Sequence, residues 1–268
     1  MDILHASPDL IARVDRFGTR FNAARFGAVA ALPGNPFGVE AQHFGDGIAI
    51  KVRHSLLRGK NRIYEFRTAD LGLLADLLAW YEVDGLTCTF HVPAGQMSRA
   101  LFQGLTDAGL WSPGSGTVPV IVPDGDTPLL APSITVRRSG PEEKELYLDL
   151  FQQSFAAYPE QEPEYRAFQW AEDSLPGGTR YVAEIDGQPV GMASFPIVGG
   201  IGFLGTAGVL PEYRRCGVHS ALIQRRLHDA ATLGCSLVIG GGGLGTTTFR
   251  NQERAGLRLI PAGSVWRE

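Results

Sequence analysis

The chain has 268 residues, a formal net charge of −4, and 44% hydrophobic and 19% charged residues. This composition is typical of a soluble globular protein with one large or two moderate cores, and it excludes a disordered chain. Because the sequence has no basic tract and no apolar run long enough to cross a bilayer, neither nucleic-acid binding nor a membrane-spanning segment is expected.

No secretory signal is expected at the start of the N-terminal half, because its first ten residues include acids and no long apolar run. Residues 73–110 predict a helix, a glycine, a strand, a glycine-containing loop and a second helix. The same order recurs in residues 222–257, and both segments end in Ala-Gly-Leu. We therefore expect an internal repeat of a whole domain, with chance similarity between two α/β segments as the alternative.

The segment 122–133, VPDGDTPLLAPS, separates the two halves. Its three prolines, two aspartates and glycine cannot continue a helix or a central strand, so a linker is predicted. We expect two domains, residues 1–130 and residues 131–268.

The second half alternates predicted strands and helices, which indicates a mixed α/β fold. The helix expected at 218–233 places Val218, Leu222, Ile223, Leu227 and Ala230 on one face, which predicts that this face is buried. In chain order the patterns predict a strand at 133–139, helices at 141–158 and 163–175, a hairpin at 179–198 with its turn at Asp186-Gly187, a strand at 201–210, the helix at 218–233, a strand at 235–241, a helix at 247–256 and a strand at 257–260.

The turn 213–220, YRRCGVHS, joins the strand at 201–210 to the helix at 218–233. One interpretation is a plain chain reversal, in which Gly217 permits the geometry and the arginines are solvated. The other is an anion site, in which N–H groups at the helix N-terminus bind a phosphate with help from Arg214, Arg215 and the Ser220 hydroxyl. The strand before the turn and the helix after it favour the anion site.

The turn and the element order resemble the Gcn5-related N-acetyltransferase (GNAT) family over residues 133–260. The family's phosphate-loop pattern is Arg/Gln-x-x-Gly-x-Gly/Ala; Arg214 and Gly217 match it, whereas His219 stands where glycine or alanine is usual. The segment RNQERAGL is similar to the family's later helix and includes its asparagine, Asn251. In the first half, RIYEFRTADLG lacks the loop pattern. The resemblance therefore implies a tandem acyl-CoA N-acyltransferase-like fold with a degenerate first copy.

The resemblance also implies that acetyl-CoA is the co-substrate and that its acetyl group passes directly to an amine in a ternary complex. The pyrophosphate is expected on the turn, the pantetheine arm along the strand before it, and the His219 ring outside the site. Cys216 is expected to be a small loop residue rather than a nucleophile. The predicted cofactor-binding residues are Ala207, Gly208, Val209, Arg214, Arg215, Cys216, Gly217, Val218, His219, Ser220 and Asn251.

The sequence does not identify a catalytic residue. Gln252 occupies the place of a tyrosine that many family members use to protonate the leaving thiolate, and the strand at 201–210 contains no acid. Glu184, Tyr158, Glu160 and Glu164 are candidates to contact the amine, with a solvated surface group as the alternative for each. No metal is expected.

Two other functions stay open: a CoA-binding sensor or scaffold without catalysis, and transfer of a different acyl group. The acceptor is expected to be a small-molecule or peptide amine, and the sequence decides neither its identity nor the oligomeric state. The cysteines Cys88, Cys216 and Cys235 are odd in number and widely spaced, as is typical of a reducing compartment. We therefore expect a cytoplasmic protein.

Overall fold

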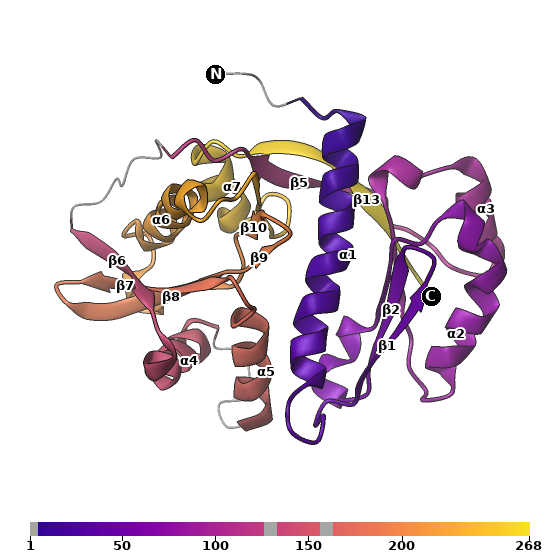
Figure 1. The fold of residues 1–268 in the computed structure, drawn as a ribbon, viewed down its shortest axis with the longest axis horizontal. Coiled ribbons are helices and arrows are strands. Elements are labelled where there is room, and N and C mark those ends of the chain that lie inside the picture. Colours follow the sequence, from indigo (N-terminus) through magenta and orange to yellow (C-terminus); the bar gives the residue numbers. More distant parts are fainter. Residues whose placement is uncertain (1–4, 126–132, 156–162) are drawn as a thin grey trace. The chain divides into compact units, whose positions relative to one another are not determined.

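The computed structural model describes residues 5–125, 133–155 and 163–268, which form a mixed α/β structure (Figure 1). The chain divides into two compact units. The first unit runs to Thr117 and also contains Ile260–Glu268, and the second unit is Val118–Leu259. No helix among the described residues is long and apolar enough to cross a membrane.

The first unit consists of a five-stranded arrangement in the order β1-β2-β3-β4-β13, with three helices. Strands β3 and β4 are parallel, and the other neighbours are antiparallel. Phe66 and Phe90, both fully buried, lie in its core. The elements are α1 (Pro8–Ala30), β1 (Val39–Phe44), β2 (Gly47–Val52), β3 (Arg62–Tyr64), the 3-10 turn η2 (Thr68–Leu73), α2 (Leu74–Glu82), β4 (Thr89–Val92), α3 (Arg99–Asp107) and β13 (Arg258–Arg267).

The second unit contains an antiparallel group of strands in the order β11-β8-β7-β6 and a second group in the order β5-β12-β10-β9. Within the second group β10 and β12 are parallel. The elements are β5 (Ser115–Ile121), β6 (Ile134–Ser139), α4 (Lys144–Ser154), α5 (Pro163–Asp173), β7 (Thr179–Ile185), β8 (Gln188–Phe195), β9 (Ile197–Val198), β10 (Ile201–Phe203), β11 (Ala207–Val209), the 3-10 turn η5 (Pro211–Tyr213), α6 (Val218–Thr232), β12 (Leu237–Ile239) and α7 (Thr247–Arg254).

The predicted hairpin at 179–198 is confirmed as β7 and β8. Its two turn residues, Asp186 and Gly187, have φ angles of 49° and 74°. Positive φ at both central positions matches the right-handed twist of the strands, so Asp-Gly is a favoured hairpin turn. Ile185 pairs with Gln188 across it.

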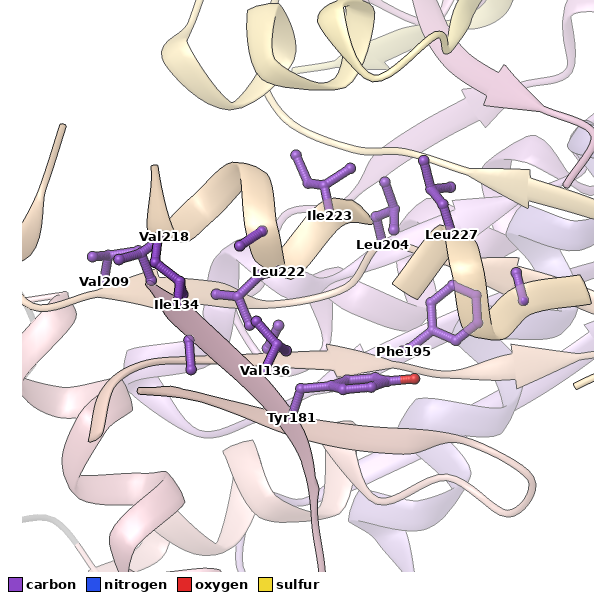
Figure 2. Packing of buried hydrophobic residues seen from close by; sticks show 14 of the residues in the cluster. Ile134, Val136, Tyr181, Phe195, Leu204, Val209, Val218, Leu222, Ile223 and Leu227 are labelled. Carbon is purple, nitrogen blue, oxygen red and sulfur yellow. The ribbon is translucent and has the colours of Figure 1, made fainter. Parts of the chain in front are cut away.

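The predicted apolar face of α6 is also confirmed. Leu222, Ile223 and Leu227 have exposed fractions of 0% and pack in one cluster with Tyr181 and Phe195 from the strands (Figure 2). Full burial of each such side chain stabilises the fold by about 1.5–3 kcal/mol. The helix that follows the turn 213–220 is therefore firmly anchored.

The strand predicted at 201–210 is interrupted. Its first part, β10, pairs with β12, and its second part, β11, pairs with β8. Leu204–Thr206 lie between these two pairings, and we call this segment the strand break. The chain thus leaves one group of strands and joins the other at the strand break.

The observed division of the chain differs from 1–130 and 131–268, because Val118–Ile121 belong to the second unit and Ile260–Glu268 belong to the first. Ile121 and Val120 at the end of β5 pair with β12 in the second unit. At the other end of the chain, Ser264–Arg267 of β13 pair with β4 in the first unit. The last strand is also longer than the predicted 257–260.

Candidate functional site

The turn before α6 leaves the start of this helix without a side-chain cap. Arg215 and Gly217 both have left-handed backbone conformations, with φ of 65° and 90°. Gly217 is the N-cap residue and has no side chain to accept from the first turn. The first N–H groups of a helix have no partner within it, and the helix dipole favours an anion there. Those N–H groups belong to Val218, His219 and Ser220, so this helix start can bind a phosphate.

Strand β11 is the edge of its group of strands. On either side of β11 the backbone is hydrogen-bonded to β8. The Thr206 carbonyl accepts from the Ser194 N–H at 2.8 Å, and the Leu210 N–H donates to the Val190 carbonyl at 3.0 Å. Since alternate residues of an antiparallel strand bond to the same neighbour, Ala207 and Val209 direct their backbone groups to the open edge. An extended ligand can pair there as an added strand does.

Gly208 lies in the middle of this edge, where nothing larger fits. A Cβ atom at this position would lie 2.6 Å from Ser154 Cβ and 3.1 Å from Phe155 Cε2. The end of α4 therefore packs directly on the β11 backbone, and these two residues form a wall of the site.

The helix start and the β11 edge line the same cavity, which has a volume of about 580 Å³. Ten of the eleven predicted cofactor-binding residues are among the residues around it. None of the described residues that line it is acidic, and three are arginines. The lining residues are Ser154, Phe155, Ala207, Gly208, Val209, Tyr213, Arg214, Arg215, Gly217, Val218, His219, Ser220, Thr247, Thr248, Asn251 and Arg254.

Cys216 is the predicted residue that is not part of this lining. Its thiol is exposed and lies 3.6 Å from the Arg214 carbonyl oxygen, which folds the side chain back on its own turn. Only its place between the two left-handed residues Arg215 and Gly217 connects it with the site.

Arg214 lines the cavity and also hydrogen-bonds to the protein itself. Its guanidinium donates to the Ser154 carbonyl at 2.8 Å and to the Val209 carbonyl at 3.3 Å. The side chain thus fastens the end of α4 to β11, and part of its hydrogen-bonding capacity is used on the protein itself. Arg215 is exposed, and no such carbonyl contact engages it among the described residues.

The expected place of the His219 ring is outside the site, but in the structure the ring lies against Asn251 and lines the cavity. Its Nδ1 atom lies 3.1 Å from Asn251 Nδ2. The Asn251 carbonyl oxygen accepts from Arg254 Nη1 at 3.1 Å, which leaves the Asn251 amino group to donate to the ring. His219 Nδ1 is therefore the acceptor, and Nε2 carries the proton. Burial, with the charge of Arg226 as the smaller cause, lowers the pKa of His219 to about 4, so the ring is neutral at pH 7.

Of the four candidates to contact the amine, Glu184 is the one whose side chain the structure describes, and it does not line the cavity. Glu184 is bound to Arg137 at 2.7 Å, in a cluster with Glu143. Tyr158, Glu160 and the side chain of Glu164 lie outside the described residues. Gln252 is buried and donates to the Gly241 carbonyl at 2.9 Å, so it holds the loop after β12.

Several lining residues were not predicted from the sequence. Ser154 and Phe155 come from the end of α4, Thr247, Thr248 and Arg254 from α7, and Tyr213 from η5. Arg254 lies three residues after Asn251, so it shares a helix face with it, and this spacing could have indicated it. The α4 residues carry no comparable signal, because only tertiary packing brings them to β11.

Residues 144–241 match the model of the acetyltransferase (GNAT) family. That range includes β11, the turn and α6. No curated protein matches the chain at a significant level.

Solved structures resemble the chain over nearly its whole length. A GCN5-related N-acetyltransferase from Kribbella flavida has a TM-score of 0.60 at 16% identity, with 91% of this chain and 94% of that one covered. One from Sphaerobacter thermophilus has a TM-score of 0.59 at 16% identity, covering 98% and 93%. FemX has a TM-score of 0.58 at 10% identity, covering 99% and 97%. These likenesses show the fold. The family match identifies residues 144–241 as a GNAT domain.

Proposed function

We propose that the second unit binds an acyl-CoA, with acetyl-CoA as the expected co-substrate, and transfers the acyl group to an amine. The observation that carries this proposal is the common cavity of two features: the uncapped start of α6 and the open edge of β11. Its volume of about 580 Å³ is in the usual range for a cofactor site. An anionic ligand fits a lining that contains arginines and no acid.

Each part of the ligand has a place in this proposal. The diphosphate lies on the N–H groups of Val218, His219 and Ser220. The pantetheine arm runs along β11 and pairs with the backbone groups of Ala207 and Val209. The thioester then extends toward the strand break, where β10 and β11 separate.

The reaction requires little covalent participation by the protein. The amine nitrogen attacks the thioester carbonyl carbon, the carbon–sulfur bond breaks, CoA leaves as a thiolate, and the amine gives up one proton. A thiol pKa of about 8.5 makes the thiolate a tolerable leaving group near neutral pH. The protein contributes chiefly by holding the two reactants in position.

A charge at Ser220 tests the phosphate site. Ser220→Asp places a carboxylate in the first turn of α6, where the helix dipole favours it, so the melting temperature should be unchanged or higher. The same carboxylate repels the diphosphate, so the affinity for CoA should fall about 100-fold or more. Ser220→Asn, of equal size and no charge, is the matched control. Titration calorimetry with CoA measures the affinity of both variants. Equal affinity in the Asp and Asn variants would contradict the assignment.

A CoA-binding module without catalysis is the second candidate. It is favoured by the lack of a carboxylate in the described lining and by the structural role of Gln252. The two are separated by turnover: a transferase releases CoA thiol from an acyl-CoA in the presence of some amine, and a sensor binds CoA without release. A panel of acyl-CoA thioesters with small-molecule and peptide amines covers both the acyl group and the acceptor.

We also propose that the first unit is a degenerate copy of the second. Both units contain an antiparallel hairpin, a pair of parallel strands joined by a helix, and a later helix. The described cysteines are free thiols, which fits the proposed cytoplasmic location.

A further inference from the structure

The strand break leaves two carbonyls without a strand partner: that of Gly205 in the break and that of Ser194 in β8. On the β8 side, the Ser194 N–H still donates to the Thr206 carbonyl at 2.8 Å. The Ser194 carbonyl accepts instead from Arg226 Nη1 at 3.0 Å, and the same nitrogen lies 3.4 Å from the Gly205 carbonyl oxygen. An unsatisfied buried carbonyl is costly, so Arg226 replaces the strand partner that the break removes.

Arg226 is an unusual residue for this place. It is 1% exposed and sits on α6 between Leu222 and Leu227, whose packing is shown in Figure 2. Its remaining hydrogen bond, from Nε, goes to the Leu222 carbonyl at 2.9 Å, so within the described chain all its hydrogen bonds go to main-chain carbonyls. Burial lowers its pKa to about 10, which keeps it charged at neutral pH.

A buried charge without a carboxylate in contact is expensive, and an apolar side chain is often equally or more stabilising at such a position. Packing alone therefore does not account for an arginine here. Its Nη1 group reaches both the Ser194 and the Gly205 carbonyl, and neither leucine nor methionine has a donor that could do so.

A second helix holds the other end of the strand break. Gln169 of α5 donates to Thr206 Oγ1 at 3.2 Å and to Asp173 Oδ2 at 2.6 Å. The same carboxylate oxygen accepts from the Tyr147 hydroxyl at 2.9 Å. Gly205 and Thr206 are thus fixed from α6 and from α5, directly before the β11 edge begins.

We propose that Arg226 is a positioning residue, which keeps the strand break open and so fixes the β11 edge that receives the pantetheine arm of the ligand. The inference rests on the proposed function, since it assigns a partner to the β11 edge. Arg226 does not line the cavity and acts only through the backbone of Gly205 and Ser194.

The test compares two ligands. CoA and 3′-phospho-ADP share the 3′-phosphoadenosine and the diphosphate, and CoA alone of the two carries the pantetheine arm. In Arg226→Met, the affinity for CoA should fall about tenfold, equivalent to the loss of one or two hydrogen bonds along β11. The affinity for 3′-phospho-ADP should change less than twofold. Arg225→Met is the matched control, because Arg225 is on the same helix and binds Asp229 and the Val136 carbonyl, away from the break.

The outcomes separate the inference from the proposed function. Equal affinities in wild type and Arg226→Met, or an equal loss for both ligands, would overturn the positioning role. If wild type binds neither ligand, the proposed function fails, and amide hydrogen exchange then tests the positioning role. The N–H groups of Ser194 and Leu210 should exchange faster in Arg226→Met than in Arg225→Met. Equal exchange in the two variants would overturn the positioning role. If Arg226→Met does not fold, Arg226→Lys, which keeps the charge without the planar fork, is measured in both assays.

Discussion

His219 differs from the residue that the phosphate-loop pattern specifies, and its surroundings explain how the loop accommodates it. The ring packs beside the cavity with Nδ1 against Asn251, whose carbonyl is held by Arg254. A small residue would leave this amide without its partner. His219 and Asn251 therefore act as a pair that links the start of α6 to α7.

The neutral state of this ring makes the protein sensitive to acid. The folded pKa of about 4 lies below the value of 6.5 for a free histidine, so the unfolded chain binds more protons between these values. His219 therefore contributes stability that is complete above about pH 6.5 and is lost as the pH falls toward 4. His219→Gln keeps an acceptor for Asn251. Between pH 6.5 and pH 4 its free energy of unfolding should fall less than that of the wild type, and the difference should reach up to about 3 kcal/mol. Urea unfolding at several pH values measures it.

His228→Gln, on the same helix and away from the cavity lining, is the control for this experiment. An equal effect from both substitutions would assign the acid sensitivity to the helix rather than to the His219 ring.

The contact between Gly208 and Ser154 predicts a reciprocal pair of substitutions. Gly208→Ala brings a methyl group to 2.6 Å from Ser154 Cβ, so the protein should lose about 1–3 kcal/mol of stability. Adding Ser154→Gly removes the obstructing atom and should recover part of that loss. A double-mutant cycle from urea unfolding gives the coupling energy, and strictly additive effects would show that the two residues do not limit each other.

Among the elements, the end of β5 pairs in the second unit although the residues before it belong to the first, and β13 pairs in the first unit although the residues before it belong to the second. Ile121 at the end of β5 pairs with Val238 and packs against the core of the second unit. The second unit thus depends on residues that precede the predicted linker.

A substitution in β5 tests this dependence. Ile121→Ala should reduce the stability of the second unit by about 2 kcal/mol, since it removes methyl and methylene groups from a partly buried site. Val122→Ala is the control, because Val122 is 51% exposed. Hydrogen exchange of the α6 amides reports the opening free energy of the second unit; if the two variants exchange alike, β5 is not a working part of that core.

The elements also show what the sequence could and could not predict. The β7–β8 hairpin and the buried face of α6 follow from local patterns, Asp186-Gly187 and the spacing of Leu222 and Leu227, and both are confirmed. The sequence pattern predicts a continuous strand through the strand break, because no local pattern shows the contacts of Arg226 with the Ser194 and Gly205 carbonyls. The pairings of β5 and β13 do not follow from the sequence for the same reason: strand partners are set by tertiary packing, which no short pattern encodes.

At the scale of the whole molecule, the two units differ in the N–H groups that are free to bind a phosphate. In the first unit the turn between β3 and α2 corresponds in element order to the turn before α6. There the Asp70 carboxylate accepts from the Arg67 N–H at 2.9 Å, and the Arg67 guanidinium is bound to Glu65 at 3.1 Å and Asp46 at 2.6 Å. Acidic side chains thus occupy the place where a diphosphate would need free N–H groups.

This difference predicts one CoA per chain. Calorimetric titration of the wild type should give a stoichiometry of one, and Ser220→Asp should leave no second binding event. A stoichiometry of two, or residual tight binding in that variant, would mean that the first unit retains a phosphate site.

The position of β13 in the chain has a consequence for biosynthesis. More than half of the sequence separates β4 from the strand that pairs with it. During translation the first unit emerges with the edge of β4 uncovered. This edge stays uncovered until β13 leaves the ribosome and pairs with it. An uncovered strand edge is a template for pairing with other chains. Nascent or truncated chains that end before Ile260 should therefore depend on chaperones far more than the finished protein does.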